Sequence, residues 1–351
     1  MGATDAKDGP EGLIKPLPGM LVVFMVSTTD KDLGSAEDVE VRTLKSAPSY
    51  PDVIPKQKII KQELRTVEGM ETGFLVKAYL PGIVIAEATV EFDDILSRRA
   101  LDLKRLLAGE CRRVLDEFGC NRDFDEEYSV YCISGYSGDP EVFLSLYGDR
   151  IAALLKNEDA PLDEEEVRLT LATSLKYGKD DITIVDWDGA FIFDAAGDFR
   201  SDIDLFEIAN LQLLRSRVLD NELDRRLEKI LSRLRTPGRV QLLRTREVRM
   251  VLTEIIEIRT QSILESEAVD HNIKLIGDWY SARLYSLIAK KFHLDAWASD
   301  IKEKLQTLED VYAMASENFS ISYRATIEFV ILAGWFILLI LYLFEYFLTT
   351  K

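Results

Sequence analysis

Short apolar runs separated by turn residues dominate the first half of the chain. Their length and their content of β-branched and aromatic residues are typical of strands. Pro81-Gly82 separates two of these runs and signals a turn. Another stretch has apolar residues at alternate positions, as in a half-buried strand. The predicted strands are residues 20–27, 73–80, 82–92, 127–136 and 166–178.

Two amphipathic stretches in the same half predict helices. The first covers residues 94–119 and ends at Gly119, and the second covers residues 140–158 with Pro140 near its start. Strands and helices that alternate in this way indicate an α/β domain.

The stretch "KDDITIVDWDGAFIFD", residues 179–194, predicts a β-hairpin. Asp-Gly pairs favour two-residue type I′ turns, because both central positions need a positive φ. With Asp188 and Gly189 at those positions, the expected pairs are Trp187 with Ala190, Val185 with Ile192, and Ile184 with Phe193.

Long helical patterns replace the strands from residue 201 onward. Three of them cover residues 201–235, 239–266 and 272–292, and a fourth begins near Asp295. Apolar residues along the fourth helix follow a heptad spacing, which predicts a seam within the helical bundle or between subunits. This seam comprises Ile301, Leu305, Leu308, Tyr312, Ala315 and Phe319.

The last segment of the chain is strongly apolar. From Phe329 to Phe344 it has 16 uncharged residues, and the wider segment 325–348 has 24. Such a helix is about 36 Å long, enough to cross a bilayer. We therefore predict a transmembrane helix at 325–348, and a single-pass membrane protein with its bulk facing the cytoplasm. Its expected anchor residues are Glu328, Phe329, Trp335, Tyr342, Glu345 and Tyr346.

These elements predict an α+β fold class. We expect a flexible lead-in at 1–19, an α/β domain with a mixed or antiparallel sheet at 20–197, a helical bundle or stalk at 201–320, and the C-terminal transmembrane helix. No presequence rich in arginine and no secretory signal is recognisable at the start of the chain.

Composition narrows the functional classes. The net charge of −18 opposes non-specific binding to nucleic acid, which needs positive charge. Three cysteines without CxxC pairs and only two histidines give no reason to expect a disulfide framework, a zinc cluster or a multi-histidine site. We therefore expect no cofactor.

One basic stretch departs from this acidic background. Residues 212–250 contain eleven Lys or Arg against five Asp or Glu. They form either a patch for an anionic partner, such as RNA or lipid head groups, or a helical hairpin balanced by acidic neighbours. The patch would comprise Arg215, Arg217, Arg225, Arg226, Arg244 and Arg246.

The hairpin tip also resembles the first motif of the haloacid-dehalogenase phosphatases, in which a nucleophilic Asp follows an apolar strand. Asp186 and Asp188 would then act with Mg²⁺ on a phosphate ester. However, helical patterns follow where such an enzyme needs more strands, and Ala190 occupies the place of the usual Thr. A simpler metal site would use Asp180, Asp181, Asp186 and Asp188.

Three stretches of the second half resemble the YagE-type family, which includes the "required for meiotic nuclear division" proteins. They are "KYGKDDITIVDWDGAFIFD", "FEIANLQLLRSRVLDNELDRRLEKI" and the segment from Tyr285 to Phe347. The resemblance implies a C-terminally anchored protein without established enzymatic activity, and eukaryotic relatives are implicated in supporting mitochondrial translation.

The sequence therefore favours a non-enzymatic scaffold or tether that forms homo-oligomers and binds a protein partner not identified by the sequence. A membrane-tethered phosphatase using Asp186 and Asp188 is one alternative. A ribosome or nucleic-acid tether using the basic stretch Arg215–Arg249 is the other, although no aromatic or glycine residues typical of RNA-binding modules accompany it.

Overall fold

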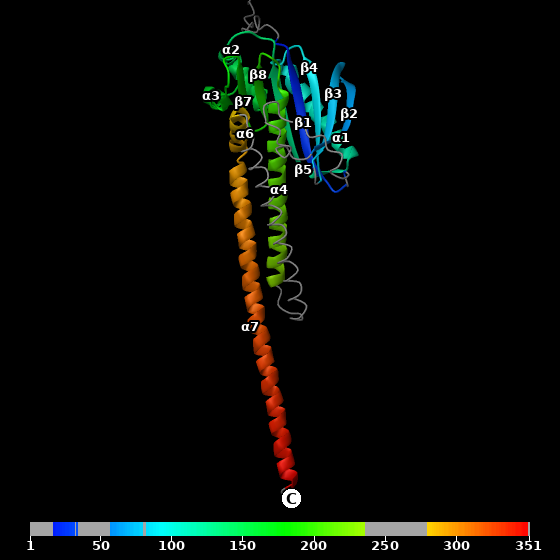
Figure 1. Cartoon of the computed structure of the whole chain (residues 1–351), viewed down its shortest axis with the longest axis vertical. Coiled ribbons are helices and arrows are strands. Elements are labelled where there is room, and N and C mark those ends of the chain that lie inside the picture. Colours follow the sequence, from blue (N-terminus) through cyan, green and yellow to red (C-terminus); the bar gives the residue numbers. More distant parts are fainter. Residues whose placement is uncertain (1–16, 32, 34–56, 80–81, 236–278, 350–351) are drawn as a thin grey trace, which may run out of the picture. The chain divides into compact units, whose positions relative to one another are not determined.

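The computed structural model describes residues 17–31, 33, 57–79, 82–235 and 279–349 (Figure 1). It divides into two compact units, Met1–Val218 with Glu267–Ala298, and Leu219–Ser266 with Ser299–Lys351. Its strands are β1 (Gly19–Thr29), β2 (Gln57–Val67), β3 (Met70–Tyr79), β4 (Ile83–Phe92), β5 (Cys120–Ile133), β6 (Ser174–Leu175), β7 (Asp181–Val185) and β8 (Gly189–Asp194). Its described helices are α1 (Arg98–Glu117), α2 (Glu141–Leu155), α3 (Glu164–Ala172), α4 (Arg200–Arg235), α6 (Trp279–Lys291) and α7 (Leu294–Thr349).

All eight described strands form one mixed sheet in the first unit, in the order β2-β3-β4-β1-β5-β8-β7-β6. The neighbours β5 and β8 are parallel, and every other described pair is antiparallel. The tight β2–β3 connection uses Glu68 and Gly69, which both have a positive φ, as a type I′ hairpin turn requires.

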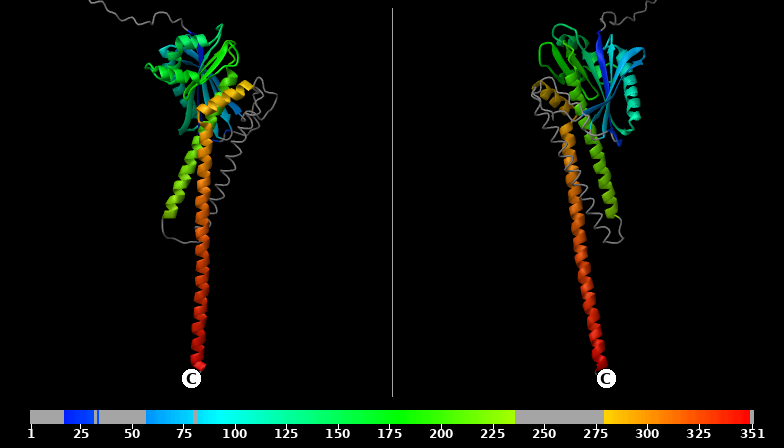
Figure 2. Two further views of the ribbon diagram at one scale, coloured as in Figure 1. Left: turned by 90° about the vertical axis from the view of Figure 1, so that its left-hand side faces the viewer. Right: turned by 45° about the vertical axis from the view of Figure 1, so that its right-hand side comes forward.

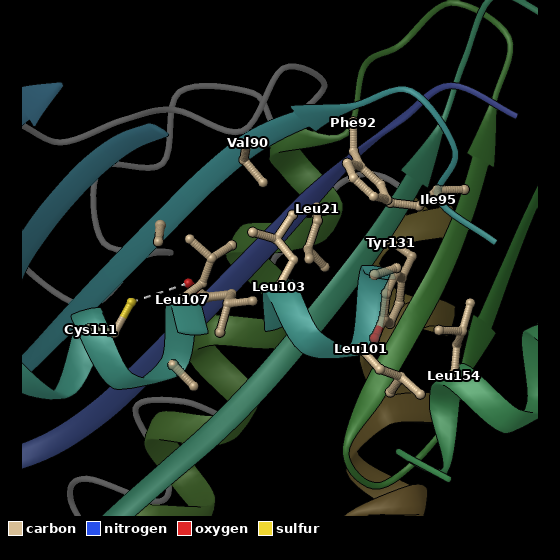
Figure 3. Packing of buried hydrophobic residues seen from close by; sticks show 14 of the residues in the cluster. Leu21, Val90, Phe92, Ile95, Leu101, Leu103, Leu107, Cys111, Tyr131 and Leu154 are labelled. Atoms are coloured by element: carbon tan, nitrogen blue, oxygen red, sulfur yellow. Dashed lines mark hydrogen bonds between the residues drawn. The ribbon is translucent and has the colours of Figure 1, made fainter. Parts of the chain in front are cut away.

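The sheet separates two apolar cores. Because side chains alternate along a strand, β1 directs Leu21 and Val23 to one face and Val22 and Phe24 to the other. Helices α1 and α2 cover the first face, and Figure 3 shows Leu101, Leu103 and Leu107 of α1 packed there with Tyr131. Helices α4 and α6 cover the second face (Figure 2). This layering places polar side chains of both helical layers against the sheet.

Most predicted elements of the first half are present. The predicted strands near 20–27, 73–80, 82–92 and 127–136 correspond to β1, β3, β4 and β5, and both predicted helices are found as α1 and α2.

The strand predicted at 166–178 is wrong, because most of it is helix α3. Asp163 caps this helix by accepting a hydrogen bond from the Glu165 N–H, and three glutamates follow in its first turn. Negative charge there stabilises the N-terminus of a helix.

The predicted transmembrane helix is also wrong. Among the residues that the structure describes, no helix combines the length and the hydropathy of a membrane span. The fold class with a stalk ending in a transmembrane helix is therefore corrected to a mixed sheet with helices on both faces. The prediction of a tail-anchored, single-pass membrane protein is contradicted with it.

The second unit includes a polar contact between α4 and α7. The Lys304 ammonium lies 2.7 Å from a carboxylate oxygen of Asp220 and 2.7 Å from one of Asp224. In the predicted heptad seam, Ile301, Leu305 and Leu308 are buried. The side chains of Tyr312, Ala315 and Phe319 lie outside the described residues, so the role of the seam stays a prediction.

Candidate functional site

The candidate nucleophile Asp186 lies at the tip of the β7–β8 hairpin. The hairpin is present, but its register differs from the prediction. Val185 pairs with Ala190, and the Asp186 N–H donates to the Gly189 carbonyl at 2.8 Å. Trp187 and Asp188 therefore form the tip, and neither Asp188 nor Gly189 has a positive φ. The type I′ turn centred on Asp188-Gly189 is thus wrong, and the turn lies one residue earlier, so that Val185 pairs with Ala190 and not with Ile192.

The carboxylate of Asp186 is enclosed, with the residue only 1% exposed. Its Oδ1 atom lies 2.7 Å from the Lys291 ammonium and accepts the Trp187 N–H at 2.7 Å. Its Oδ2 atom lies 3.1 Å from the Lys156 ammonium. A buried carboxylate needs such compensation, because burial without a partner costs several kcal/mol.

Both lysines come from the ends of helices. Lys156 directly follows α2, and Lys291 is the last residue of α6. Cations are favourable at these ends, where the helix dipole is negative. Lys156 also contacts Glu166 of α3 at 2.8 Å. Burial lowers the pKa of Lys156, but its bonds to Glu166 and Asp186 outweigh this effect and raise the pKa overall. Asp186 thus joins the hairpin tip to α2 and α6.

Aromatic side chains pack behind this centre. The Tyr128 hydroxyl donates to the backbone carbonyl of Asp186 at 3.0 Å, and its ring stacks on Phe206 of α4 and meets the edge of Phe292. Burial raises the pKa of the Tyr128 hydroxyl well above its ordinary value. Trp187 remains 44% exposed while its ring contacts Phe292. The tip is therefore fixed from the core side, and only Trp187 and Asp188 reach solvent.

The other predicted metal ligands do not join Asp186. Both carboxylate oxygens of Asp181 accept backbone N–H groups of the preceding turn, from Tyr177 and Gly178. Asp188 is exposed. Within the described ranges, no group of three or more His, Cys, Asp or Glu side chains could hold a metal ion. The arrangement around Asp186 is that of a structural ion-pair centre.

A second polar cluster, which sequence reasoning missed, lies between the sheet and α4. The Lys77 ammonium of β3 lies 2.6 Å from the Glu207 carboxylate and 3.2 Å from that of Glu87. Arg200 bonds both oxygens of Glu87, at 2.8 and 2.9 Å, and also Asp204, at 2.6 Å. Glu207 is fully buried. Three carboxylates therefore surround two cations in the interior.

The pKa shifts in this cluster follow from burial and charge. Burial alone lowers the pKa of Lys77, but the charges of Glu207 and Glu87 raise it overall. Burial raises the pKa of Glu207, and the nearby cations offset only part of this effect. Although burial opposes it, the charges of Lys77 and Arg200 lower the pKa of Glu87. Glu207 therefore holds a proton more readily than Glu87 does.

Another buried acid, Asp202, links three elements of the second face. Its Oδ2 atom accepts hydrogen bonds from Tyr280 of α6 at 3.0 Å and Thr183 of β7 at 3.3 Å. Burial raises the pKa of Asp202 to about 7, and the nearby carboxylates of Asp194 and Asp181 add to the shift. Its charge state therefore changes near neutral pH.

The comparisons with known proteins give one relative and one family. The family described as "Uncharacterized protein MJ0711, N-terminal domain" matches residues 32–200. The chain is also 27% identical over 317 residues to "Uncharacterized protein MJ0711" of Methanocaldococcus jannaschii, an alignment covering 90% of this chain and 94% of that protein. No solved structure matches. None of these findings concerns the YagE-type family, so that resemblance stays a prediction.

The predicted basic patch is only partly described. Arg217 contacts the Glu126 carboxylate, and Arg225 and Arg226 both contact Glu222. Arg215 also has a partner. Arg244 and Arg246 lie outside the described residues. Arg217, Arg225 and Arg226 thus have acidic neighbours, as in the alternative of a charge-balanced helical hairpin.

Of the predicted anchor residues in α7, Trp335 and Glu328 are exposed. The side chains of Phe329, Tyr342, Glu345 and Tyr346 lie outside the described part. Sequence reasoning missed Lys156, Lys291 and the Lys77 cluster. A signal for the cluster was present, because Lys77 and Glu87 each have apolar residues on both sides within a strand pattern, and such charges need internal partners.

Proposed function

We propose that this chain is a non-enzymatic scaffold or tether, built on the sheet with helices on both faces. One observation carries the proposal: Asp186, the residue that an enzyme of the predicted type would need, is buried and paired with two lysines. A nucleophile must reach its substrate, and a magnesium ligand needs an oxygen free for the ion. The ammonium groups of Lys156 and Lys291 lie against the two carboxylate oxygens of Asp186, where a substrate or an ion would have to approach.

Exposed apolar side chains on α7 support an assembly role, because a scaffold needs a contact surface. Nine large apolar residues from Val330 to Ile340 are each more than half exposed. The chain has no charged residue between Phe329 and Phe344. A partner surface that covers this stretch must therefore also be free of charged side chains. The same helix of a second copy meets this requirement.

Light scattering on the full chain checks the assembly. We expect a mass above that of one chain. A monomeric mass, or association with lipid vesicles in place of self-association, would contradict this part of the proposal.

Substitution of Asp186 tests whether its role is structural or catalytic. Asp186→Asn keeps the shape but leaves Lys156 and Lys291 without their shared negative partner. Because both lysines are partly exposed, we expect a loss of about 2 kcal/mol in the free energy of unfolding. Asp188→Asn is the matched control at the exposed tip and should change stability by less than about 0.5 kcal/mol. Denaturant unfolding followed by circular dichroism measures both.

The same variants decide the enzymatic alternative. Each is assayed for hydrolysis of p-nitrophenyl phosphate with Mg²⁺ beside the unsubstituted protein. We expect no hydrolysis above background from any of the three. Hydrolysis by the unsubstituted protein that disappears in a folded Asp186→Asn variant would overturn the proposal.

A further inference from the structure

The two edges of the sheet differ in length. At one edge β6 has two residues, whereas at the other edge β2 has 11 residues. Among the described strands, β2 pairs with β3 alone, so the N–H and C=O groups on its outer side have no ladder partner there (Figure 1). Proteins keep such edges short, bulged or charged, because a long free edge pairs with another strand. The edge at β2 is therefore a candidate surface for strand addition.

Only part of β2 is regular. Its register with β3 shifts between Ile59 and Lys61, which marks a bulge, and the tight turn begins after Val67. Between these points the pairing with β3 is uninterrupted. A bulge bends the strand and discourages pairing on its outer side. The segment suited to strand addition is therefore residues 61–67, and Leu64 is its midpoint.

One face of this segment has an uncovered apolar side chain at its midpoint. Gln62, Leu64 and Thr66 alternate on the second face of the sheet, and all three are exposed. Leu64 is 70% exposed although it is the apolar residue of the three. Its neighbour on β3 is Gly73, which has no side chain to cover it. Because side chains in a sheet are stabilised by their cross-strand neighbours, a strand added at the free edge would supply the neighbour that Leu64 lacks.

The other face of the segment carries charges, which usually protect an edge from pairing. Here they are paired within the chain. The Lys61 ammonium lies 2.9 Å from the Glu117 carboxylate of α1 and 3.2 Å from that of Glu63. The Arg65 guanidinium contacts Glu63 and lies over the ring of Phe74, 5.0 Å from its centroid. Lys61 and Arg65 are therefore drawn toward α1 and β3, away from the outer side of β2.

The sequence of this segment is complementary to itself in one register. Because outward-pointing backbone groups alternate along a strand, an antiparallel pair of identical strands is centred on a residue that faces its own copy. A centre at Leu64 sets Glu63 against Arg65 of the partner subunit. A centre at Glu63 sets Lys61 against Arg65 of the partner subunit, and like charges directly opposite are destabilising. A centre at Gln62 carries the ladder across the bulge. Charge and regularity thus select Leu64.

We propose that β2 is a homodimer interface, in which residues 61–67 pair antiparallel with the same residues of a second copy about Leu64. The two sheets then continue into one another, and the two Leu64 side chains cover each other. This interface goes beyond the association proposed for α7 and does not depend on it, because it uses the sheet alone.

Cysteine cross-linking in the full chain tests the register. Paired residues of an antiparallel ladder have Cα atoms about 4.5 to 5.5 Å apart, within the range that a disulfide bridges. Leu64→Cys should therefore form covalent dimers on mild oxidation, as seen on a non-reducing gel. Gln62→Cys, exposed on the same face, is the matched control. Its two copies lie about 13 Å apart in this register, beyond the reach of a disulfide, so it should remain a single chain on the gel. The unsubstituted protein shows the background from the native cysteines, of which Cys111 and Cys132 are buried.

A mixture of two variants checks the same register independently. Gln62 faces Thr66 of the partner subunit, so Gln62→Cys mixed with Thr66→Cys should give a covalent dimer that neither variant gives alone. Circular dichroism checks that each variant folds. Equal cross-linking of Leu64→Cys and Gln62→Cys, or none of Leu64→Cys, would overturn the proposal.

Leu64→Lys separates this interface from the one on α7. It sets like charges opposite each other at the centre of the pairing, while substitution at an exposed position changes the fold of one chain little. Light scattering should show a lower assembly mass than that of the unsubstituted protein, with an unchanged circular dichroism spectrum. An unchanged mass above that of one chain would overturn the proposal for β2 and leave the association through α7 standing, whereas a monomeric unsubstituted protein would contradict both.

Discussion

Lys77 and Lys104 are both almost completely buried, one on each face of the same sheet, yet their surroundings differ. Lys77 lies among the carboxylates of Glu207, Glu87 and Asp204, within 2.6 to 3.6 Å. Lys104 has Glu127 at 3.9 Å. Burial lowers the pKa of a lysine unless charge compensates it, so the pKa is raised in Lys77 and lowered in Lys104. The pairing of the ammonium, and not burial alone, therefore decides the direction in which each lysine pKa is shifted.

The largest expected effect comes from breaking the complete cluster. Lys77→Met leaves Glu87, Asp204 and Glu207 with Arg200 as their remaining cation in the cluster. Removing one partner of a buried ion-pair network typically costs about 3 to 5 kcal/mol, because the remaining charges stay buried. We expect a loss of this size in the free energy of unfolding, measured by urea denaturation.

Lys104→Met is the matched variant on the other face. Methionine keeps most of the apolar stem and removes an amine with weak pairing, so stability should change by no more than about 1 kcal/mol. Equal losses in the two variants would contradict the distinction between the two faces.

A smaller effect concerns the pH dependence of stability. The pKa of Asp202 is about 7 in the folded protein and about 3.8 without the fold. The folded state then binds more protons at this group, so the contribution of Asp202 to stability is greatest at low pH and falls as the pH rises from about 4 to 7, by up to about 1.4 kcal/mol per pH unit. Asp202→Asn should remove this slope, as measured by urea unfolding across the pH range.

Lys104 on the first face should make stability change with pH in the opposite direction. The folded pKa of Lys104 is below its ordinary value of 10.5, so the folded state binds fewer protons and its stability rises as the pH increases toward that value. Lys104→Met should remove this rise. A slope unchanged in either variant would show that the named group is not its source.

The parts of the fold that the sequence predicted depend on local patterns. The apolar runs of β1, β3 and β4 and the helical pattern ended by Gly119 each specify their own element. Helix α3 was predicted wrongly because Val167, Leu169 and Leu171 alternate as in a strand. Leu169 is 49% exposed, so the alternation was not a burial pattern, and the acidic first turn was the better signal.

The site depends on contacts between distant segments, which explains why much of it was missed. The motif around Asp186 drew attention to the right carboxylate, but its two lysines lie 30 and 105 residues away in the sequence. No local spacing connects them. The same holds for Lys77 and Glu207, which are 130 residues apart. The hairpin register differed because Asp186, not Trp187, pairs across the turn.

The most direct test of the difference between the two faces is a titration of both lysines in the folded protein. Lysine labelled with carbon-13 at the ε position is observed by NMR, and the signals are assigned with Lys77→Met and Lys104→Met. The account predicts that Lys104 loses its proton below pH 10.5 and that Lys77 remains charged beyond it. Equal pKa values, or a lower value for Lys77, would contradict it.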